Sequence, residues 1–183
     1  MTSTPALVIN TSNAPIVKAS IERREVGSKD VRVAIAYSGI CHSDVHQARS
    51  EWGSDIFPMV PGHEIVGHVV EVGSAVTKFK IGQAVGVGVF VNSCRECDAC
   101  KANLESYCEK GSVGAYNGHD YNGEVQYGGY SKEIVTDEHF VVSIADGVNL
   151  AECAPLLCAG ITVYSPLKHW KAGPGKKVAI LGM

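Results

Sequence analysis

Short segments rich in β-branched residues, separated by Gly, Pro or Asn, occupy most of the chain before residue 145. Apolar residues at every second position of 31–37 predict a strand with one buried face. Apolar residues on both faces of 65–72 predict a strand that is covered on both sides. Valine recurs at every second position over 85–91, and the segments 130–135 and 140–144 predict two further strands. Many short strands joined by Gly turns predict a mainly β fold that closes, fully or partly, into a barrel.

The hydrophobic pattern changes close to Leu150. Residues 151–167 are mostly Ala, Leu, Cys and small polar types without alternation, which predicts a helix. Because proline lacks a backbone N–H, we expect this helix to be interrupted at Pro155 and at Pro166. The continuous apolar run 178–181 predicts a buried parallel strand.

Composition narrows the class of protein. The length of 183 residues suits one domain, or one domain and the start of another. Hydrophobic residues make up 45% and charged residues 19%, which excludes a disordered chain. A net charge of −3 without a basic run argues against a nucleic-acid partner. No apolar stretch approaches the roughly 18 residues that cross a bilayer, and the N-terminus lacks the pattern of a secretory signal, so we expect a cytoplasmic protein without a membrane partner.

Four of the seven cysteines form one motif. Cys94, Cys97, Cys100 and Cys108 give the spacing C-x2-C-x2-C-x7-C in a loop of small and polar residues. An odd number of cysteines without a secretory signal favours metal or redox chemistry over a disulfide framework. Four thiolates suit a structural zinc ion. The alternatives are free cysteines, a disulfide pair or an iron–sulfur cluster, but the fourth cysteine is too distant for the bacterial ferredoxin pattern.

Three other segments carry chemically active side chains. Cys41 and a group of neighbouring polar residues lie in 41–46, His63 precedes Glu64, and Cys158 lies in an apolar segment. Taken singly, they suit a surface turn, the start of a strand and core packing. Together they contain the Cys/His/Cys set that a catalytic zinc with one open position requires.

The stretches that carry a family resemblance are GICHSDVH, PMVPGHEIVGHVVEVGS, the four-cysteine loop and APLLCAGITVYSPLKHW. From about Val8 to its last residue, the chain resembles the zinc-dependent medium-chain alcohol dehydrogenases, in the branch of the cinnamyl alcohol dehydrogenases and bacterial broad-range aldehyde reductases. The resemblance implies a GroES-like, partly open β-barrel with short helices as the catalytic domain at 1–150. It implies that 151–183 is a connecting helix and the first strand of a Rossmann cofactor domain that is truncated after the first glycine of its Gly-rich turn, Gly182.

The same resemblance implies roles for individual residues. The catalytic zinc ligands are Cys41, His63 and Cys158 with Glu64 beside them, and the structural zinc ligands are the four loop cysteines. Asp44 orients the imidazole ligand, and Ser43 and His46 relay the proton. The cofactor-binding positions are His42 and Gly182, and the substrate-pocket positions are Gln47, Trp52 and Val89. Cys153 receives no role.

The function implied is hydride transfer between a primary alcohol or aldehyde and NADP(H), with NAD(H) not excluded, in an enzyme that holds two zinc ions. The partner is a small-molecule substrate, and the full-length form can be a homodimer. One alternative is a catalytically inactive, zinc-stabilised β-module that arises from truncation. A zinc-free quinone reductase relative is disfavoured by the presence of Cys41, His63 and Cys158 together with the loop.

Overall fold

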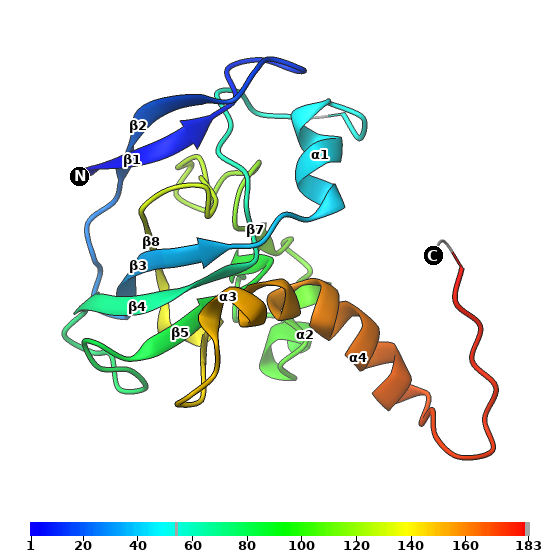
Figure 1. The fold of residues 1–183 in the computed structure, drawn as a ribbon. Coiled ribbons are helices and arrows are strands. Elements are labelled where there is room, and N and C mark those ends of the chain that lie inside the picture. The colour runs from blue at the N-terminus through cyan, green and yellow to red at the C-terminus, as the bar shows by residue number, and fades with distance from the viewer. Residues whose placement is uncertain (54, 182–183) are drawn as a thin grey trace.

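The computed structural model describes residues 1–53 and 55–181, which form three antiparallel sheets and several short helices (Figure 1). The largest sheet has the order β8-β3-β4-β5-β9. Its strands are β3 (Asp30–Ser38), β4 (Ile65–Val72), β5 (Ala84–Val87), β8 (Glu133–Asp137) and β9 (Val141–Ser143). The two smaller sheets pair β1 (Thr2–Val8) with β2 (Val17–Arg23) and β6 (Phe90–Asn92) with β7 (Val113–Gly114).

The helical elements are all short. They are α1 (His42–Ala48), α2 (Asp98–Lys101), η1 (Glu105–Tyr107), η2 (Glu138–Phe140), α3 (Leu150–Cys153), η3 (Ala154–Leu157) and α4 (Ala159–His169). Within the described residues, no single helix has the length and apolar composition needed to cross a membrane. The bent pair Leu150–Leu157 and Ala159–His169, with 56° between its parts, meets both criteria only when the parts are taken together.

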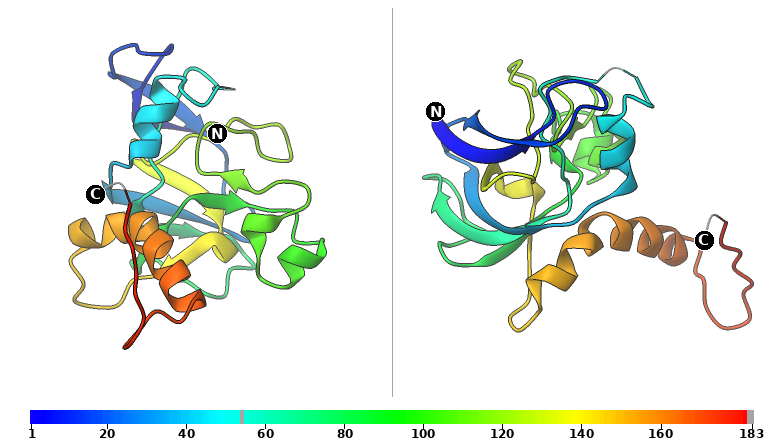
Figure 2. Two further views of the ribbon diagram at one scale, coloured as in Figure 1. Left: turned by 90° about the vertical axis from the view of Figure 1, so that its right-hand side faces the viewer. Right: turned by 45° about the horizontal axis from the view of Figure 1, so that its top comes forward.

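The five-stranded sheet curls around the main core (Figure 2, right). Val31 and Val33 of β3, Ile65 of β4 and Val85 of β5 are fully buried, as the sequence pattern predicts. The ends of the strands differ from the prediction, because Tyr37 of β3 is 51% exposed and Val70 of β4 is 42% exposed. The pairing of β3 with β4 shifts register twice, and such bulges bend a strand. Gly67 lies so close to β3 that a Cβ there would be 2.0 Å from a backbone oxygen, so glycine is required where the strands bend together.

The hairpin of β1 and β2 extends the barrel on one side, and the sequence pattern did not predict it. Leu7 N–H donates to the carbonyl of Tyr130 at 2.7 Å, and Lys132 N–H donates to the carbonyl of Pro5 at 2.9 Å. Most positions of β2 are exposed, and β1 contains Pro5, which is tolerated in a strand at an edge. In β1, Thr4 and Ala6 are buried and Leu7 is exposed, so the burial of this strand alternates but its hydrophobic pattern does not.

Several expected elements differ in extent. The valine run 85–91 is two strands, β5 and β6, because the chain leaves the large sheet at Gly88. The strand expected at 130–135 begins at Glu133, and the one expected at 140–144 is Val141–Ser143. The interruption near Pro155 occurs, as the one-turn element η3 between α3 and α4.

Two expectations about the C-terminal part are wrong. The helix α4 continues through Pro166. Proline removes one backbone hydrogen bond from the helix, but the next turn is still hydrogen-bonded, because Trp170 N–H donates to the carbonyl of Pro166. The run 178–181 is irregular rather than a strand. A parallel strand needs a neighbour, and no strand among the described residues pairs with this run.

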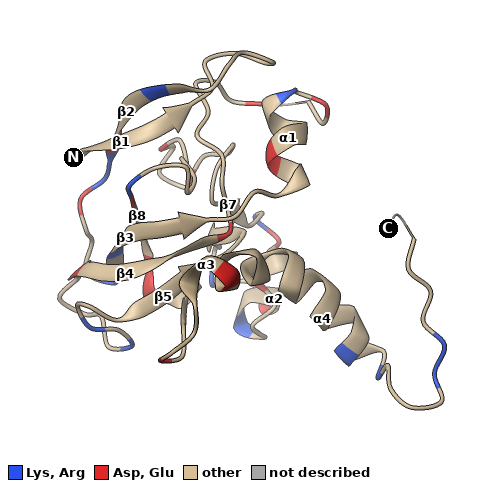
Figure 3. Ribbon diagram, in the orientation of Figure 1, with Lys and Arg blue, Asp and Glu red and all other residues tan. Residues whose placement is uncertain are grey.

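Charged residues lie mainly in loops and at strand ends (Figure 3). An exception is Arg32 in the middle of the large sheet, whose Nε lies 2.8 Å from Glu71 and whose Nη1 lies 3.3 Å from Glu133. These ion pairs tie β3 to the strands on both of its sides. By contrast, α4 extends away from the sheets with Lys168 as its only charged residue apart from the terminal histidine.

Candidate metal centres

The four-cysteine loop folds into a small lobe beyond β6 and β7. The four Sγ atoms all lie within 4.8 Å of one another, and those of Cys94 and Cys100 are 3.9 Å apart. Arg95, with a φ of 57°, turns the chain between the first two cysteines, and α2 begins directly after Cys97. A disulfide requires about 2.05 Å between sulfurs, so the four thiols are free.

Backbone N–H groups surround these sulfurs. Those of Glu96 and Cys97 donate to Cys94 Sγ at 3.5 and 3.4 Å, and that of Cys94 donates to Cys108 Sγ at 3.4 Å. The last of these bonds is the main cause that lowers the pKa of Cys108 to about 6. Donors of this kind stabilise thiolates, which are the form that binds metal. The donor set therefore fits a structural zinc ion with no open position.

The lobe is held to the barrel by charged side chains. Arg95 lies 3.0 Å from Asp137 at the end of β8 and stacks over the ring of Phe140 at 5.2 Å. Glu105 in η1 lies 2.5 Å from the His139 imidazole in η2. The lobe therefore has a fixed position on the barrel.

A second cluster forms where three segments meet. Cys41 precedes α1, His63 and Glu64 precede β4, and Cys158 lies between η3 and α4. One ligand atom from each lies within 4.8 Å of the others, and the sulfurs of the two cysteines are 3.9 Å apart. His63 and Glu64 are buried, with 4% and 2% of their surface exposed. Two thiols, an imidazole and a carboxylate are ligands that zinc accepts, so this set also fits the metal.

Glycines make this convergence possible. At Gly39 a Cβ would lie 2.0 Å from the Glu64 carboxylate, and Gly62, just before the imidazole ligand, has a φ of 104°. At Gly86 of β5 a Cβ would lie 2.7 Å from the side chain of Leu157, the residue before Cys158. Glycine at these positions allows η3 and the loop before β4 to approach closely.

Asp44 connects two of the segments. It is the third residue of α1, and its carboxylate accepts from Cys41 N–H at 2.9 Å and from Gly62 N–H at 3.1 Å. Its Oδ1 also lies 3.5 Å from His63 Nδ1, which leaves the other ring nitrogen for the cluster. Such a carboxylate fixes the tautomer and the orientation of an imidazole ligand.

The pKa values reflect this environment. Burial raises the pKa of Asp44, but the contact with His63 and the hydrogen bond from Cys41 N–H outweigh it and lower the pKa overall. Burial lowers the pKa of His63, but the Asp44 carboxylate and the Cys41 sulfur raise it overall. Burial raises the pKa of Cys158 to about 11, with a contribution from Cys41, and burial likewise raises the pKa of Glu64. Cys158 and Glu64 are therefore costly to ionise without a cation.

The structure brings some of the other expected residues to this cluster. Ser43 Oγ lies 3.5 Å from Cys41 Sγ. His46 instead pairs with Glu51 and stacks on Trp52 at 5.0 Å, and no hydrogen bond joins Ser43 to His46 in the described part of the chain.

The remaining positions lie on α1, in the loop that follows it, and between β5 and β6. His42 and Gln47 are on α1, and Trp52 is 60% exposed in the loop after it. Val89 lies between β5 and β6, where its carbonyl accepts from Ala115 N–H at 2.8 Å. Gly182 lies outside the described residues.

Two aromatic residues beside the cluster were not expected from the sequence. The Tyr130 hydroxyl donates to Asp44 Oδ2 at 3.0 Å, and the Tyr116 ring stacks on the His63 ring with 5.8 Å between centroids. Burial and the Asp44 charge raise the pKa of both phenols, so they stay protonated. The signal available in the sequence was the Gly128–Gly129–Tyr130 turn, but it does not indicate which carboxylate the tyrosine contacts.

Comparison with known proteins shows the family of this chain. The alcohol dehydrogenase GroES-like domain family matches residues 27–146. The chain belongs to this family. The sequence is 55% identical over 184 residues to NADP-dependent alcohol dehydrogenase C 1 of Mycolicibacterium smegmatis, covering 100% of this chain and 53% of that protein. It is 52% identical over 172 residues to aldehyde reductase YahK of Escherichia coli, covering 92% of this chain and 49% of that protein.

Solved structures confirm the fold of this GroES-like domain. The crystal structure of CAD from Helicobacter pylori complexed with NADP(H) superposes with a TM-score of 0.93 at 47% identity, covering 96% of this chain and 51% of that one. A cinnamyl alcohol dehydrogenase from Sorghum bicolor gives a TM-score of 0.92 at 41% identity, covering 96% and 50%. The family resemblance and the partly open barrel are therefore confirmed, and the chain spans about half the length of the relatives that it matches.

Proposed function

We propose that the chain is the metal-binding part of a zinc-dependent oxidoreductase that transfers hydride between a primary alcohol or aldehyde and NADP(H). The observation that carries this proposal is the convergence of Cys41, His63 and Cys158, with Glu64 beside them, from three separate segments. A second, four-thiol cluster in the same chain supports two zinc ions, one catalytic and one structural. At the catalytic position a zinc ion supplies Lewis-acid polarisation of the substrate oxygen.

The chain's own residues hold the cluster and move the proton. Asp44 keeps the His63 ring oriented from its position in α1. We propose that the Ser43 hydroxyl, beside Cys41, exchanges the substrate proton and that His46 passes it to solvent. The contact of His46 with the Glu51 carboxylate supports this role, because a carboxylate partner holds the imidazole in one orientation.

The substrate and the cofactor belong to the whole protein. Gln47, Trp52 and Val89 are our proposed substrate-pocket residues, and His42 and Gly182 our proposed cofactor contacts. The names of the relatives support NADP(H) over NAD(H).

We further propose that 1–150 is the catalytic domain and that 151–183 is the start of a cofactor domain. Apolar side chains of α4 are exposed, and Val163 has 59% of its surface exposed, which supports a further domain packed against this helix. We also propose that the whole protein forms a homodimer.

The test is an assay of aldehyde-dependent NADPH oxidation, with NADH in parallel. The assay uses two zinc-loaded proteins, this chain and the longest protein expressed from the same gene. Each is compared with its Cys158→Ser variant as a matched control. We expect the longest product to oxidise NADPH only when an aldehyde is present, and Cys158→Ser to abolish this. If neither protein shows the activity at full zinc occupancy, the chain is instead an inactive, zinc-stabilised β-module.

A further inference from the structure

We propose that Tyr130 is a positioning residue of the second cluster: its hydroxyl holds the Asp44 carboxylate in the orientation that faces His63. This inference rests on the proposed function, because it assumes that the Cys41, His63 and Cys158 cluster binds a metal ion. It adds a residue from a distant segment of the chain to the set that determines the position of the imidazole.

The hydrogen bonds of Asp44 carry the argument. Asp44 Oδ2 accepts from Cys41 N–H at 2.9 Å and from the Tyr130 hydroxyl at 3.0 Å. Asp44 Oδ1 accepts from Gly62 N–H at 3.1 Å and faces His63 Nδ1 at 3.5 Å. A carboxylate has about four lone-pair sites, and each of the four has a partner here. Because Asp44 is 4% exposed, water cannot readily replace a lost donor.

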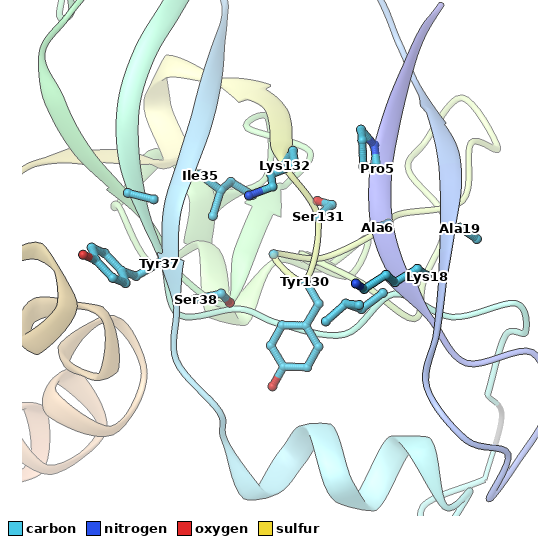
Figure 4. Close-up of a pocket in the computed structure, with 13 residues that line it drawn as sticks. Pro5, Ala6, Lys18, Ala19, Ile35, Tyr37, Ser38, Tyr130, Ser131 and Lys132 are labelled. Carbon is cyan, nitrogen blue, oxygen red and sulfur yellow. The ribbon is translucent and has the colours of Figure 1, made fainter.

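Tyr130 is itself held rigidly. Its N–H donates to the carbonyl of Pro61 at 2.9 Å, and its carbonyl accepts from Leu7 N–H at 2.7 Å. Its ring packs against a cluster of buried apolar side chains that includes Val60. Figure 4 shows the ring pointing from its loop toward α1, the helix that carries Asp44. The same side chain also borders a pocket of about 390 Å³ between β1, β2 and β3, and its hydroxyl points away from the strands that form the pocket.

The same turn also fixes the backbone that leads into His63. Gly129 N–H donates to the carbonyl of Gly62 at 2.8 Å, and Gly128 N–H donates to that of Val60 at 2.7 Å. A Cβ at Gly128 would lie 2.4 Å from the Gly62 oxygen, so the two segments are in direct contact. The segment 128–130 therefore restrains His63 in two ways: its backbone holds the residues before His63, and the Tyr130 hydroxyl holds the carboxylate that faces the imidazole.

Removal of the Tyr130 hydroxyl leaves Asp44 Oδ2 with one donor. The carboxylate can then turn about its last side-chain bond, and the ring of His63 loses part of its restraint. Substitution of such partners lowers metal affinity by about 10- to 100-fold. Because Cys41 N–H and Gly62 N–H remain in place, we expect the lower end, about tenfold.

The experiment is a Co²⁺ titration of the zinc-free chain, followed by the absorption bands of cobalt in the presence of a competing chelator. The variant Tyr130→Phe removes only the hydroxyl. The control is Tyr127→Phe, because Tyr127 packs in the same apolar cluster and, among the described residues, no contact joins its hydroxyl to Asp44. The four-cysteine site of the same chain serves as an internal reference.

A second comparison separates positioning from a general structural effect. Tyr130→Phe is measured again in an Asp44→Asn background. If Tyr130 acts through the Asp44 carboxylate, its substitution has little further effect in that background, because the group that it positions is already altered.

We expect Tyr130→Phe to weaken Co²⁺ binding at the second cluster about tenfold, with the four-cysteine site and Tyr127→Phe unchanged. Equal affinity of Tyr130→Phe and wild type overturns the role of Tyr130, as does an equal loss with and without Asp44. A wild-type chain that binds Co²⁺ only at the four-cysteine site overturns the proposed catalytic metal centre itself. The two failures are therefore distinguishable.

Discussion

Replacement of Gly86 by alanine should weaken the second metal cluster, although Gly86 lies in β5 and none of the four ligands is its neighbour in sequence. The added Cβ would lie 2.7 and 3.0 Å from the two Cδ atoms of Leu157. Ordinary contacts between carbon atoms are about 3.5–4.0 Å, so a displacement of roughly 1 Å is required. The backbone of Gly86 cannot supply it, because it is paired with β4 on one side and β9 on the other.

Leu157 must therefore move. Its two Cδ atoms are the end of a flexible, half-buried side chain, so rotation of this side chain takes up part of the displacement, and the remainder reaches Cys158, which follows it in the chain. Extra volume in a packed region costs about 1–3 kcal/mol, which is the loss that we expect in the free energy of unfolding of the metal-free chain. Metal–ligand distances are met within about 0.2 Å, so even a small part of this displacement is large when it reaches a ligand. We expect Co²⁺ affinity at the second cluster to fall, by up to about tenfold.

The assays are urea unfolding of the metal-free chain and Co²⁺ titration, with Gly118→Ala as the control. Among the described residues, no atom lies within 4 Å of a Cβ at Gly118, so this substitution should change neither quantity. Leu157→Ala removes the side chain that Gly86→Ala meets. In that background, we expect the cost of Gly86→Ala to shrink below about 0.5 kcal/mol. If Gly86→Ala costs as much in the Leu157→Ala background as in the wild-type chain, the close contact is not the cause and the reasoning is refuted.

Three further predictions concern the barrel and the lobe. Burial raises the pKa of Asp30, but the hydrogen bonds and charge of Arg24 outweigh it and hold this pKa below its ordinary value. The ion pair therefore stabilises the fold above about pH 4, and this stabilisation is lost as the pH falls through the lowered pKa. The difference in unfolding free energy between wild type and Asp30→Asn should therefore shrink on acidification; a difference that grows contradicts the sign. Arg32→Met should lower the free energy of unfolding in urea by about 1–2 kcal/mol. This loss is smaller than for a fully buried ion pair, because both glutamate partners reach solvent. An unchanged free energy of unfolding would show that these ion pairs contribute nothing. Cys100→Ser should remove one bound metal ion in native mass spectrometry and make the loop sensitive to protease, whereas an unchanged metal content would exclude the four-thiol site.

The sequence predicted the features whose information is local. The spacing of the loop cysteines places four thiols within one short segment, and the structure brings their sulfurs together. Alternation in 31–37 predicted β3, because a strand with one buried face must follow the period of two. In both cases the residues that determine the feature are neighbours in the chain.

Features that depend on distant contacts were missed or misplaced. Tyr130 and Asp44 are 86 positions apart, and no local pattern connects them. The strand β2 lacks alternation because most of its positions are exposed. The run 178–181 has the composition of a buried strand, but a strand also needs a partner, and composition does not supply one.

The second cluster lies between these two cases. Its ligands come from three segments, each of which taken singly has an ordinary interpretation; together they contain a Cys/His/Cys set, and the family resemblance implies that this set binds zinc. The structure shows why they meet: glycines at 39, 62 and 86 allow the segments to approach within contact distance. Those glycines could not be distinguished in the sequence from the others that form simple turns.

The central claim is that this chain contains the ligands for two zinc ions. Zinc content measured by inductively coupled plasma mass spectrometry, on chain purified from zinc-supplemented cells, tests this claim most directly. We predict two zinc ions per chain, and one in the Cys158→Ser variant. A single zinc ion in the wild-type chain would contradict the catalytic site, and a chain without zinc would contradict the whole account.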